Sequence, residues 1–176
     1  DEVQSGMGRT GKWWAYQHYQ ITPDIQTCAR MLQVAAAERK KNMFPNEASA
    51  ISSTWGGGHV LDLAMGIEVI RQIKKQKLLK NAEKQGKKIH ERLKEIHVET
   101  NGIHHPRGLG LMQAFDLPTT ELRNKFRDKL FQKGLIMLGC GESGMRISPA
   151  LNIKEEEIEE GMQIIAETAR QFKKRG

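Results

Sequence analysis

Apolar residues recur at helical spacing through the middle and at the end of the chain. Between residues 60 and 75, and again between 78 and 97, they repeat every three or four positions and so fall on one face of a helix. The same period begins again near Lys154. Acidic residues gather at 155–160 and basic residues at 170–175, an order that complements the dipole of a helix between them. The pattern predicts three helices over these segments.

Between the second and third of these helices, short apolar runs alternate with a polar helical segment. Residues 109–117 predict a strand that a proline ends. Residues 120–132 predict a helix that begins at a threonine N-cap and ends before a glycine. Short strands are expected at 135–138 and 145–148, around a glycine turn. Residues 76–176 are therefore expected to form a compact α+β domain.

The first sixty residues have no long periodic segment and are rich in glycine, serine and aromatic residues. Residues 13–19 predict a short helix that Pro23 stops. Residues 24–25 and 32–37 predict short buried strands. This pattern indicates that residues 1–60 are part of a larger domain and do not form a core of their own.

The basic residues are concentrated in one stretch of the chain. The 176 residues carry a net charge of +7, and residues 71–97 alone account for all of it. The stretch contains no aromatic residues, which a groove for single-stranded nucleic acid would use for stacking. We interpret its lysines as the solvated face of a helix, and nucleic acid is not expected as a partner.

Several other classes of protein and of site are not expected. No run of eighteen apolar residues exists, so no membrane span is predicted. Cys28 and Cys140 lie far apart and do not form a disulfide framework, which favours a reduced, cytoplasmic protein. The adjacent His104 and His105 cannot easily chelate one ion together, so we interpret them as loop residues and predict no metal site.

The chain opens with DEVQSGMGRTG, in which three glycines follow an acidic strand end. A carboxylate beside a glycine loop can hold a cationic ring nitrogen or a metal ion. An aspartate before glycines is also ordinary turn chemistry. The motif by itself leaves these alternatives open.

Later segments, in a fixed order, favour the first alternative. After residues 1–11 come PDI at 23–25, STWGG at 53–57, PRGLGLM at 106–112 and MRISPAL at 145–151. Together they resemble the class III aminotransferases, which are pyridoxal-phosphate enzymes of fold type I. Within that family they are most similar to the L-lysine 6-transaminase branch.

The resemblance implies an α/β fold, namely the C-terminal part of a fold type I PLP-dependent transferase. It assigns residues 1–60 to a partial PLP-binding large domain, residues 61–75 to a connecting helix, and residues 76–176 to the α+β small domain. Family members are more than twice as long, so the chain is expected to be a C-terminal fragment.

The resemblance also implies roles for single residues. Asp1 matches the aspartate that pairs with the protonated pyridine nitrogen of pyridoxal 5'-phosphate, Val3 the residue packed on the ring, and Gln4 the side chain at the ring hydroxyl. Thr54 matches the threonine that binds the cofactor phosphate of the neighbouring subunit. Arg146 matches the arginine that grips a substrate carboxylate, a bidentate task to which the guanidinium is suited.

The Schiff-base lysine of the family is replaced. The family pattern places it six residues after the aspartate of PDI, where this sequence has Arg30. Arginine stays protonated at physiological pH and offers no neutral amine. Lys40 and Lys41 are close in sequence but fall outside the pattern.

These features predict an enzyme fold that transfers the ε-amino group of lysine, as the small-molecule donor, to 2-oxoglutarate. The chain alone is predicted to be inactive for two reasons. Arg30 replaces the Schiff-base lysine, and the glycine loop that cradles the cofactor phosphate in the family lies upstream of the DEVQ motif. The alternatives are a truncated or split-gene remnant without catalytic function, and another ω-aminotransferase of the ornithine or 4-aminobutyrate type. The expected partner is a second copy in a homodimer or a separate N-terminal half.

Overall fold

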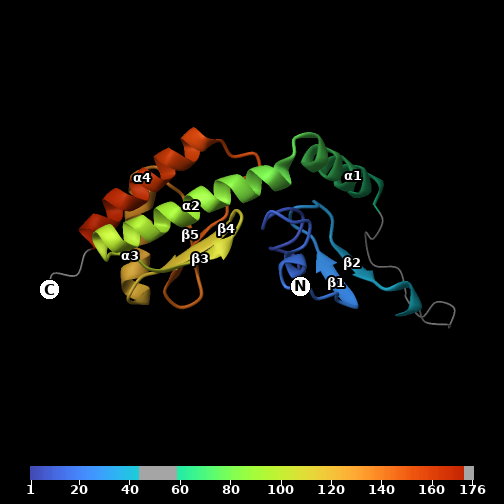
Figure 1. Ribbon diagram of the computed structural model, residues 1–176, viewed down its shortest axis with the longest axis horizontal. Coiled ribbons are helices and arrows are strands. Elements are labelled where there is room, and N and C mark those ends of the chain that lie inside the picture. Colours follow the sequence, from blue (N-terminus) through green and yellow to red (C-terminus); the bar gives the residue numbers. More distant parts are fainter. Residues whose placement is uncertain (44–58, 173–176) are drawn as a thin grey trace. The chain divides into compact units, whose positions relative to one another are not determined.

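The chain forms two compact units, each with its own antiparallel sheet (Figure 1). The computed structural model describes residues 1–43 and 59–172. The first unit extends over Asp1–Leu79 and the second over Lys80–Gly176.

The first unit combines an irregular N-terminal coil with a two-stranded hairpin and one long helix. Its elements are η1 (Ala15–His18), β1 (Ile25–Cys28), β2 (Ala36–Arg39), η2 (Lys41–Met43) and α1 (Val60–Lys75). The helix predicted over 60–75 is confirmed, and the short helix expected at 13–19 is a single 3₁₀ turn. The strand expected at 32–37 is wrong in position, because the backbone N–H of Leu32 donates to the carbonyl of Ala29 and closes a turn there.

Glu2 holds the irregular start of the first unit together. Its buried carboxylate accepts hydrogen bonds from the Ser5 hydroxyl at 2.5 Å and from the backbone N–H groups of Ala15 and Tyr16 at 3.1 and 3.0 Å. Its own backbone N–H donates to the carbonyl of Thr27 in β1 at 2.9 Å. Since hydrogen bonds to a charged group are the strong ones, this residue fixes the first turn, η1 and β1 relative to one another.

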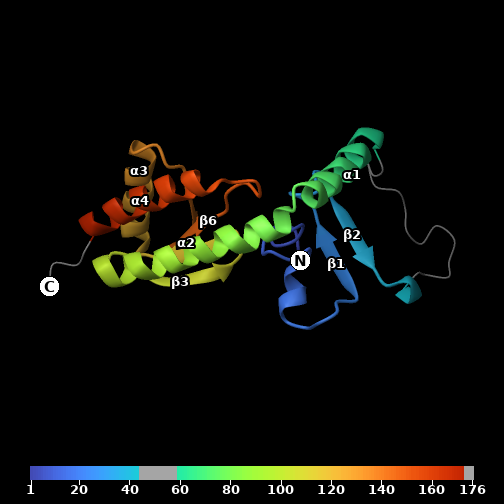
Figure 2. The ribbon, with the colours of Figure 1, turned by 45° about the horizontal axis from the view of Figure 1, so that its top comes forward.

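The described part of the second unit is a four-stranded sheet with helices α2 and α4 lying over it (Figure 2). The strand order is β3-β4-β6-β5, and all neighbouring pairs are antiparallel. The elements are α2 (Leu78–Thr100), β3 (His104–Leu109), β4 (Met112–Asp116), α3 (Thr120–Gln132), β5 (Leu138–Cys140), β6 (Gly144–Ile147) and α4 (Glu155–Gln171). The α+β arrangement expected for this region is confirmed.

The core of the second unit lies between the sheet and its helices. Phe115 of β4 packs edge-on against Phe126 of α3 with ring centroids 5.8 Å apart, and Phe126 packs in the same way against Phe172 at 5.1 Å. The α2 stripe that the sequence predicted is buried here. Its fully buried members are Ala82, Ile89, Leu93 and Ile96.

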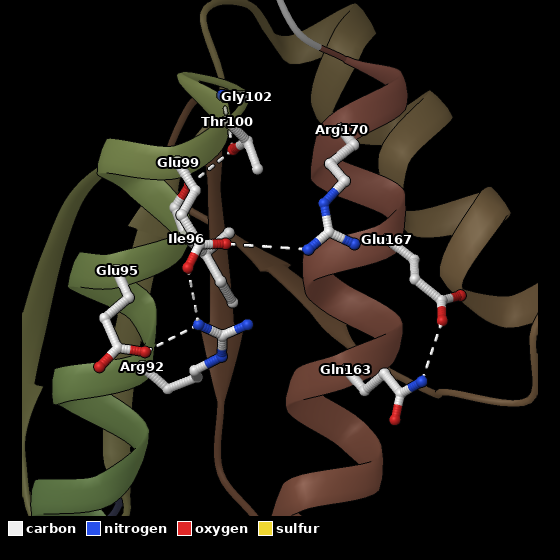
Figure 3. A network of polar contacts seen from close by, with 9 residues as sticks. All are labelled: Arg92, Glu95, Ile96, Glu99, Thr100, Gly102, Gln163, Glu167 and Arg170. Atoms are coloured by element: carbon white, nitrogen blue, oxygen red, sulfur yellow. Dashed lines mark hydrogen bonds and ion pairs between the residues drawn. The ribbon is translucent and has the colours of Figure 1, made fainter.

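An ionic seam joins α2 to α4 on the surface (Figure 3). Arg92 donates to Glu95 at 2.7 Å and to Glu99 at 3.1 Å, and Arg170 of α4 approaches the other oxygen of Glu99 at 3.8 Å. Because these side chains are about one third or more exposed, the seam contributes little to the stability of the helix pair.

The apolar run at 109–117 contains a turn that its pattern hides. The structure has a hairpin of β3 and β4 there, with Gly110 at the turn in a left-handed conformation (φ 51°). His104 and His105, expected in a loop, therefore lie in β3. The strand expected at 135–138 is also displaced and begins only at Leu138.

The hairpin turn is held directly against α2. A Cβ atom on Gly86 would lie 2.1 Å from the carbonyl oxygen of Gly110, so helix and turn approach as closely as two glycines permit. The buried Gln113 amide donates to the Gly110 carbonyl at 2.9 Å, and its oxygen lies 3.1 Å from Nδ1 of His90 in α2.

Candidate active site

Asp1 is held by the end of strand β1. Its Oδ1 atom accepts hydrogen bonds from the backbone N–H of Val3 at 2.9 Å and from the Thr27 hydroxyl at 3.2 Å. Among the described residues, none donates to its other oxygen. One carboxylate oxygen is thus fixed, and the second remains available to a donor from outside the unit.

The other N-terminal residues of the predicted site differ in exposure. Val3 is half-buried and Gln4 is exposed, with a polar contact of its own. Both follow Asp1 in the same turn. Thr54, the predicted phosphate ligand, lies outside the described residues.

Arg30 lies in the exposed turn that follows β1. Its backbone carbonyl accepts a hydrogen bond from the Gln33 side chain at 2.9 Å. Thr27, which contacts Asp1, is only three residues earlier in the chain. The structure thus brings two of the predicted site residues, Asp1 and Arg30, to the same end of one strand.

Arg146 belongs to the second unit. It is half-buried in β6, opposite Ala114 of β4 and Leu138 of β5. It lines a cavity of about 320 Å³ between the end of the sheet and α4. The lining is mostly apolar, and a carboxylate, that of Glu157, also contributes.

A second charged cluster lies on the β3–β4 hairpin, and no sequence motif indicated it. Both Nη atoms of Arg107 donate to the Asp116 carboxylate, at 2.9 and 2.8 Å, and Nδ1 of His105 lies 3.2 Å from it. Burial alone would raise the pKa of Asp116, but the hydrogen bonds from Arg107 and His105 hold that pKa below its usual value. The hydrogen bond to Asp116 likewise raises the pKa of Arg107. The sequence pattern did not predict this hairpin, so it could not indicate that Arg107 and Asp116 lie together.

Comparison with known proteins decides the family. The family model for aminotransferase class III matches residues 1–169. The chain belongs to the class III aminotransferases. The fold expected from the sequence, that of a PLP-dependent transferase, is confirmed by the solved structures that it matches.

Individual class III relatives are similar over nearly the whole chain. An L-lysine-epsilon aminotransferase of Amycolatopsis lactamdurans is 35% identical over 94% of this chain, and a 4-aminobutyrate aminotransferase of Dictyostelium discoideum is 34% identical over 99%. The chain spans 38% and 36% of the lengths of these two relatives.

The chain is also similar to solved structures of aminotransferases. A lysine aminotransferase from M. tuberculosis in the internal aldimine form has a TM-score of 0.88 and 31% identity, over 96% of this chain and 40% of its own. An ornithine aminotransferase from Plasmodium yoelii has a TM-score of 0.89 and 28% identity, over 98% of this chain and 47% of its own.

Class III aminotransferases depend on pyridoxal 5'-phosphate, so the described residues can be tested for their fit to it. Asp1 fits, because its fixed carboxylate presents an oxygen that can accept a hydrogen bond from a protonated pyridine nitrogen. Arg30 does not fit, because a guanidinium has no neutral amine to bond covalently to an aldehyde. The chain thus suits the non-covalent contacts of this cofactor and not its covalent attachment.

Two further findings concern metal ions and membranes. In residues 1–43 and 59–172, histidine, cysteine and carboxylate side chains form no group of three or more that could hold a metal ion. The helices within the same residues are all too short or too polar to cross a membrane.

Proposed function

We propose that this chain carries part of the cofactor and substrate sites of an ω-aminotransferase of the lysine 6-transaminase type, and that it is catalytically inactive as its sequence stands. The observation that carries the proposal is that β1 holds the Asp1 carboxylate in place and is followed by Arg30 where the family has a lysine. The first supports binding of pyridoxal 5'-phosphate, and the second excludes its covalent capture.

Each residue has a separate task in this proposal. When bound, the cofactor would act as an acceptor for electrons released from the substrate, provided its ring nitrogen stays protonated. Asp1 would keep that proton in place, since a nearby carboxylate favours the charged form of the ring. Val3 would pack on the ring and Gln4 would contact its hydroxyl. Thr54 would bind the phosphate of a neighbouring subunit's cofactor, which implies a homodimer.

Arg146 is the proposed substrate anchor. A guanidinium binds a carboxylate with two parallel hydrogen bonds and so fixes its orientation as well as its charge. Its place on a strand between two paired neighbours gives it a rigid base. The substrates would be an amino donor and 2-oxoglutarate, both of which carry the carboxylate that this residue needs.

Arg30 accounts for the proposed inactivity. The family lysine acts both as an amine and as a base, and an arginine at neutral pH can do neither. Loss of a general base alone typically lowers a rate by about 10²–10⁴. Arg30 would therefore remove turnover without removing the non-covalent contacts proposed for Asp1, Val3 and Gln4.

The relatives of the chain use two kinds of amino donor. The first relatives are lysine-epsilon aminotransferases at 34–35% identity, but acetylornithine and 4-aminobutyrate aminotransferases reach 34%. A donor of the ornithine or 4-aminobutyrate type is thus the second candidate. We place the protein in the cytoplasm because both of its cysteines are free thiols.

The test supplies the part of the relatives that this chain does not span. The upstream part of the M. tuberculosis lysine aminotransferase is joined to this chain, and the Arg30 form is compared with Arg30→Lys. Only the Arg30→Lys variant should form a borohydride-reducible bond to pyridoxal 5'-phosphate. Only this variant should transfer amino groups from the substrate lysine to 2-oxoglutarate. Arg127→Lys, on the exposed face of α3, is the matched control and should change nothing.

Other results would contradict the proposal in distinct ways. A reducible bond in the Arg30 form would mean that Lys40, Lys41 or another lysine is the nucleophile. If the Arg30→Lys variant is active with ornithine or 4-aminobutyrate as substrate but not with free lysine, the second candidate donor is favoured. Absence of cofactor binding in both forms would overturn the assignment of Asp1.

A further inference from the structure

Thr27 of β1 is hydrogen-bonded to two consecutive residues at the start of the chain. Its backbone carbonyl accepts a hydrogen bond from the N–H of Glu2 at 2.9 Å, and its hydroxyl donates to Oδ1 of Asp1 at 3.2 Å. The first contact fixes the backbone at Glu2, and the second fixes the direction of the Asp1 carboxylate. One residue of β1 therefore holds both the main chain and a side chain of this segment.

The position of Thr27 in β1 gives its hydroxyl a rigid base. Thr27 lies opposite Ala37 of β2 in the antiparallel register and is half-buried, between the buried Gln26 and Cys28. Because successive side chains of a strand point to opposite faces, Thr27 lies on the other face from these two residues. A β-branched side chain is restricted in its rotamers, so the hydroxyl is carried by a stiff side chain on a paired strand.

The two donors to the Asp1 carboxylate differ in what they attach it to. The N–H of Val3 is two residues away in the same turn, so it moves together with Asp1. The hydroxyl of Thr27 is 26 residues away along the chain and belongs to the strand. Of these two contacts, only that with Thr27 ties the carboxylate to an element outside its own turn. The Thr27 hydroxyl therefore limits how far the carboxylate can rotate.

We propose that Thr27 is a positioning residue, whose hydroxyl holds the Asp1 carboxylate in the orientation in which its other oxygen accepts a hydrogen bond from the protonated pyridine nitrogen. In this proposal Thr27 touches neither cofactor nor substrate and acts only through Asp1. A carboxylate that can turn away interacts less with the nitrogen, so the nitrogen would lose its proton at a lower pH. The inference rests on the cofactor contact proposed for Asp1 and names a further residue on which that contact depends.

The fold of the N-terminal turn does not depend on the Thr27 hydroxyl. The buried Glu2 carboxylate holds the turn through the hydrogen bonds described above, and the Glu2 N–H donates to the backbone carbonyl of Thr27, which any residue at this position has. Removal of the hydroxyl alone should therefore free the Asp1 side chain and leave the backbone of the turn in place.

The test uses the protein made by joining the upstream part of the M. tuberculosis lysine aminotransferase to this chain, in its Arg30→Lys form. This protein is loaded with pyridoxal 5'-phosphate whose ring nitrogen is ¹⁵N, because the chemical shift of that nitrogen reports its protonation. Thr27→Val keeps the shape of the side chain and removes the hydroxyl. The substitution should lower the pH at which the nitrogen loses its proton by about one unit, and should lower kcat roughly three- to tenfold with KM unchanged.

Two further variants separate the hydroxyl from the rest of the side chain and from unrelated hydroxyl groups. Thr27→Ser loses the methyl group and keeps the hydroxyl, so the titration of the nitrogen and kcat should both match those of the Arg30→Lys form. Thr120→Val is the matched control, since Thr120 also donates its hydroxyl to an oxygen, the carbonyl of Glu142 at 2.8 Å, but in the second unit. It should leave both measurements unchanged.

The possible failures can be told apart. If the Arg30→Lys form binds the cofactor and Thr27→Val changes neither the titration of the nitrogen nor kcat, the positioning role is wrong and the role of Asp1 stands. If Thr27→Ser loses as much as Thr27→Val, the methyl group matters rather than the hydroxyl, and the positioning role is again wrong. If the Arg30→Lys form binds no cofactor, the proposed function itself is overturned, and this inference with it.

Discussion

At the scale of single residues, the ionisation of Asp116 is coupled to folding. Its pKa is lowered in the folded protein by Arg107 and His105, and its side chain is only 24% exposed. A lowered pKa contributes stability that is fully present above the unfolded value of about 4 and is lost as the pH falls through the folded value. The charged pair therefore stabilises the hairpin at neutral pH and not in acid.

Removing this carboxylate should have an effect that depends on pH. Asp116→Asn is expected to lower the free energy of unfolding by about 1 kcal/mol at pH 7 and by nearly nothing at about pH 2. Urea denaturation at the two pH values measures the difference. Asp128→Asn, whose carboxylate is exposed and bound to the adjacent Arg127, should change stability by less than about 0.5 kcal/mol at either pH. An equal loss at both pH values for Asp116→Asn would contradict an ionic role.

At the scale of elements, two helical glycines with opposite surroundings make a matched pair. A Cβ atom on Gly86 of α2 would lie 2.1 Å from a backbone oxygen of the hairpin turn, whereas one on Gly161 of α4 would meet only Leu135 at 3.8 Å. Helix propensity by itself favours alanine at both positions by up to about 1 kcal/mol. Only the packing differs between them.

The two alanine substitutions should therefore differ in sign. Gly86→Ala is expected to lower the free energy of unfolding by about 2–3 kcal/mol, because the backbone of Gly110 must move. Gly161→Ala is expected to raise it by up to about 1 kcal/mol. Urea denaturation of both variants provides the comparison. A stabilised Gly86→Ala would mean that helix and hairpin turn do not touch.

The same close approach explains where the sequence predicted elements well and where it did not. The 3.6-residue period of α1, α2 and α4 is a property of each helix alone, so their positions were visible in the pattern. The turn at Gly110 lies inside the apolar run LGLM and is fixed by Gly86 of α2, which is distant in sequence. Local patterns carry no information about such a partner.

The candidate site, too, could be predicted from the sequence only in part. The assignment of Asp1 to the site came from sequence motifs, whereas its hydrogen bond to Thr27 of β1 appears only in the fold. The Arg107–Asp116 pair depends on the hairpin register and could not be seen before the hairpin itself.

At the scale of the whole molecule, helix α1 exposes an apolar surface that a stable monomer would bury. Of its sixteen residues only Gly66 and Ile73 are buried. Val60, Leu61 and Met65 are 77, 68 and 54% exposed. Contiguous apolar patches on a protein surface usually mark contacts with another chain.

The chain is accordingly expected to associate, with a second copy, with a separate N-terminal half or in larger aggregates. Size-exclusion chromatography with light scattering should give a mass above 20.0 kDa, the mass of one chain. Leu61→Glu places a charge within the α1 patch and should shift the chain towards the monomer. Val98→Glu is the control: Val98 is 82% exposed on α2 and belongs to the second unit, and its replacement should leave the mass unchanged. A parent chain that remains a stable 20.0 kDa monomer would show that the exposed face of α1 needs no partner, and the homodimer proposed for the cofactor site would lose its support in this chain.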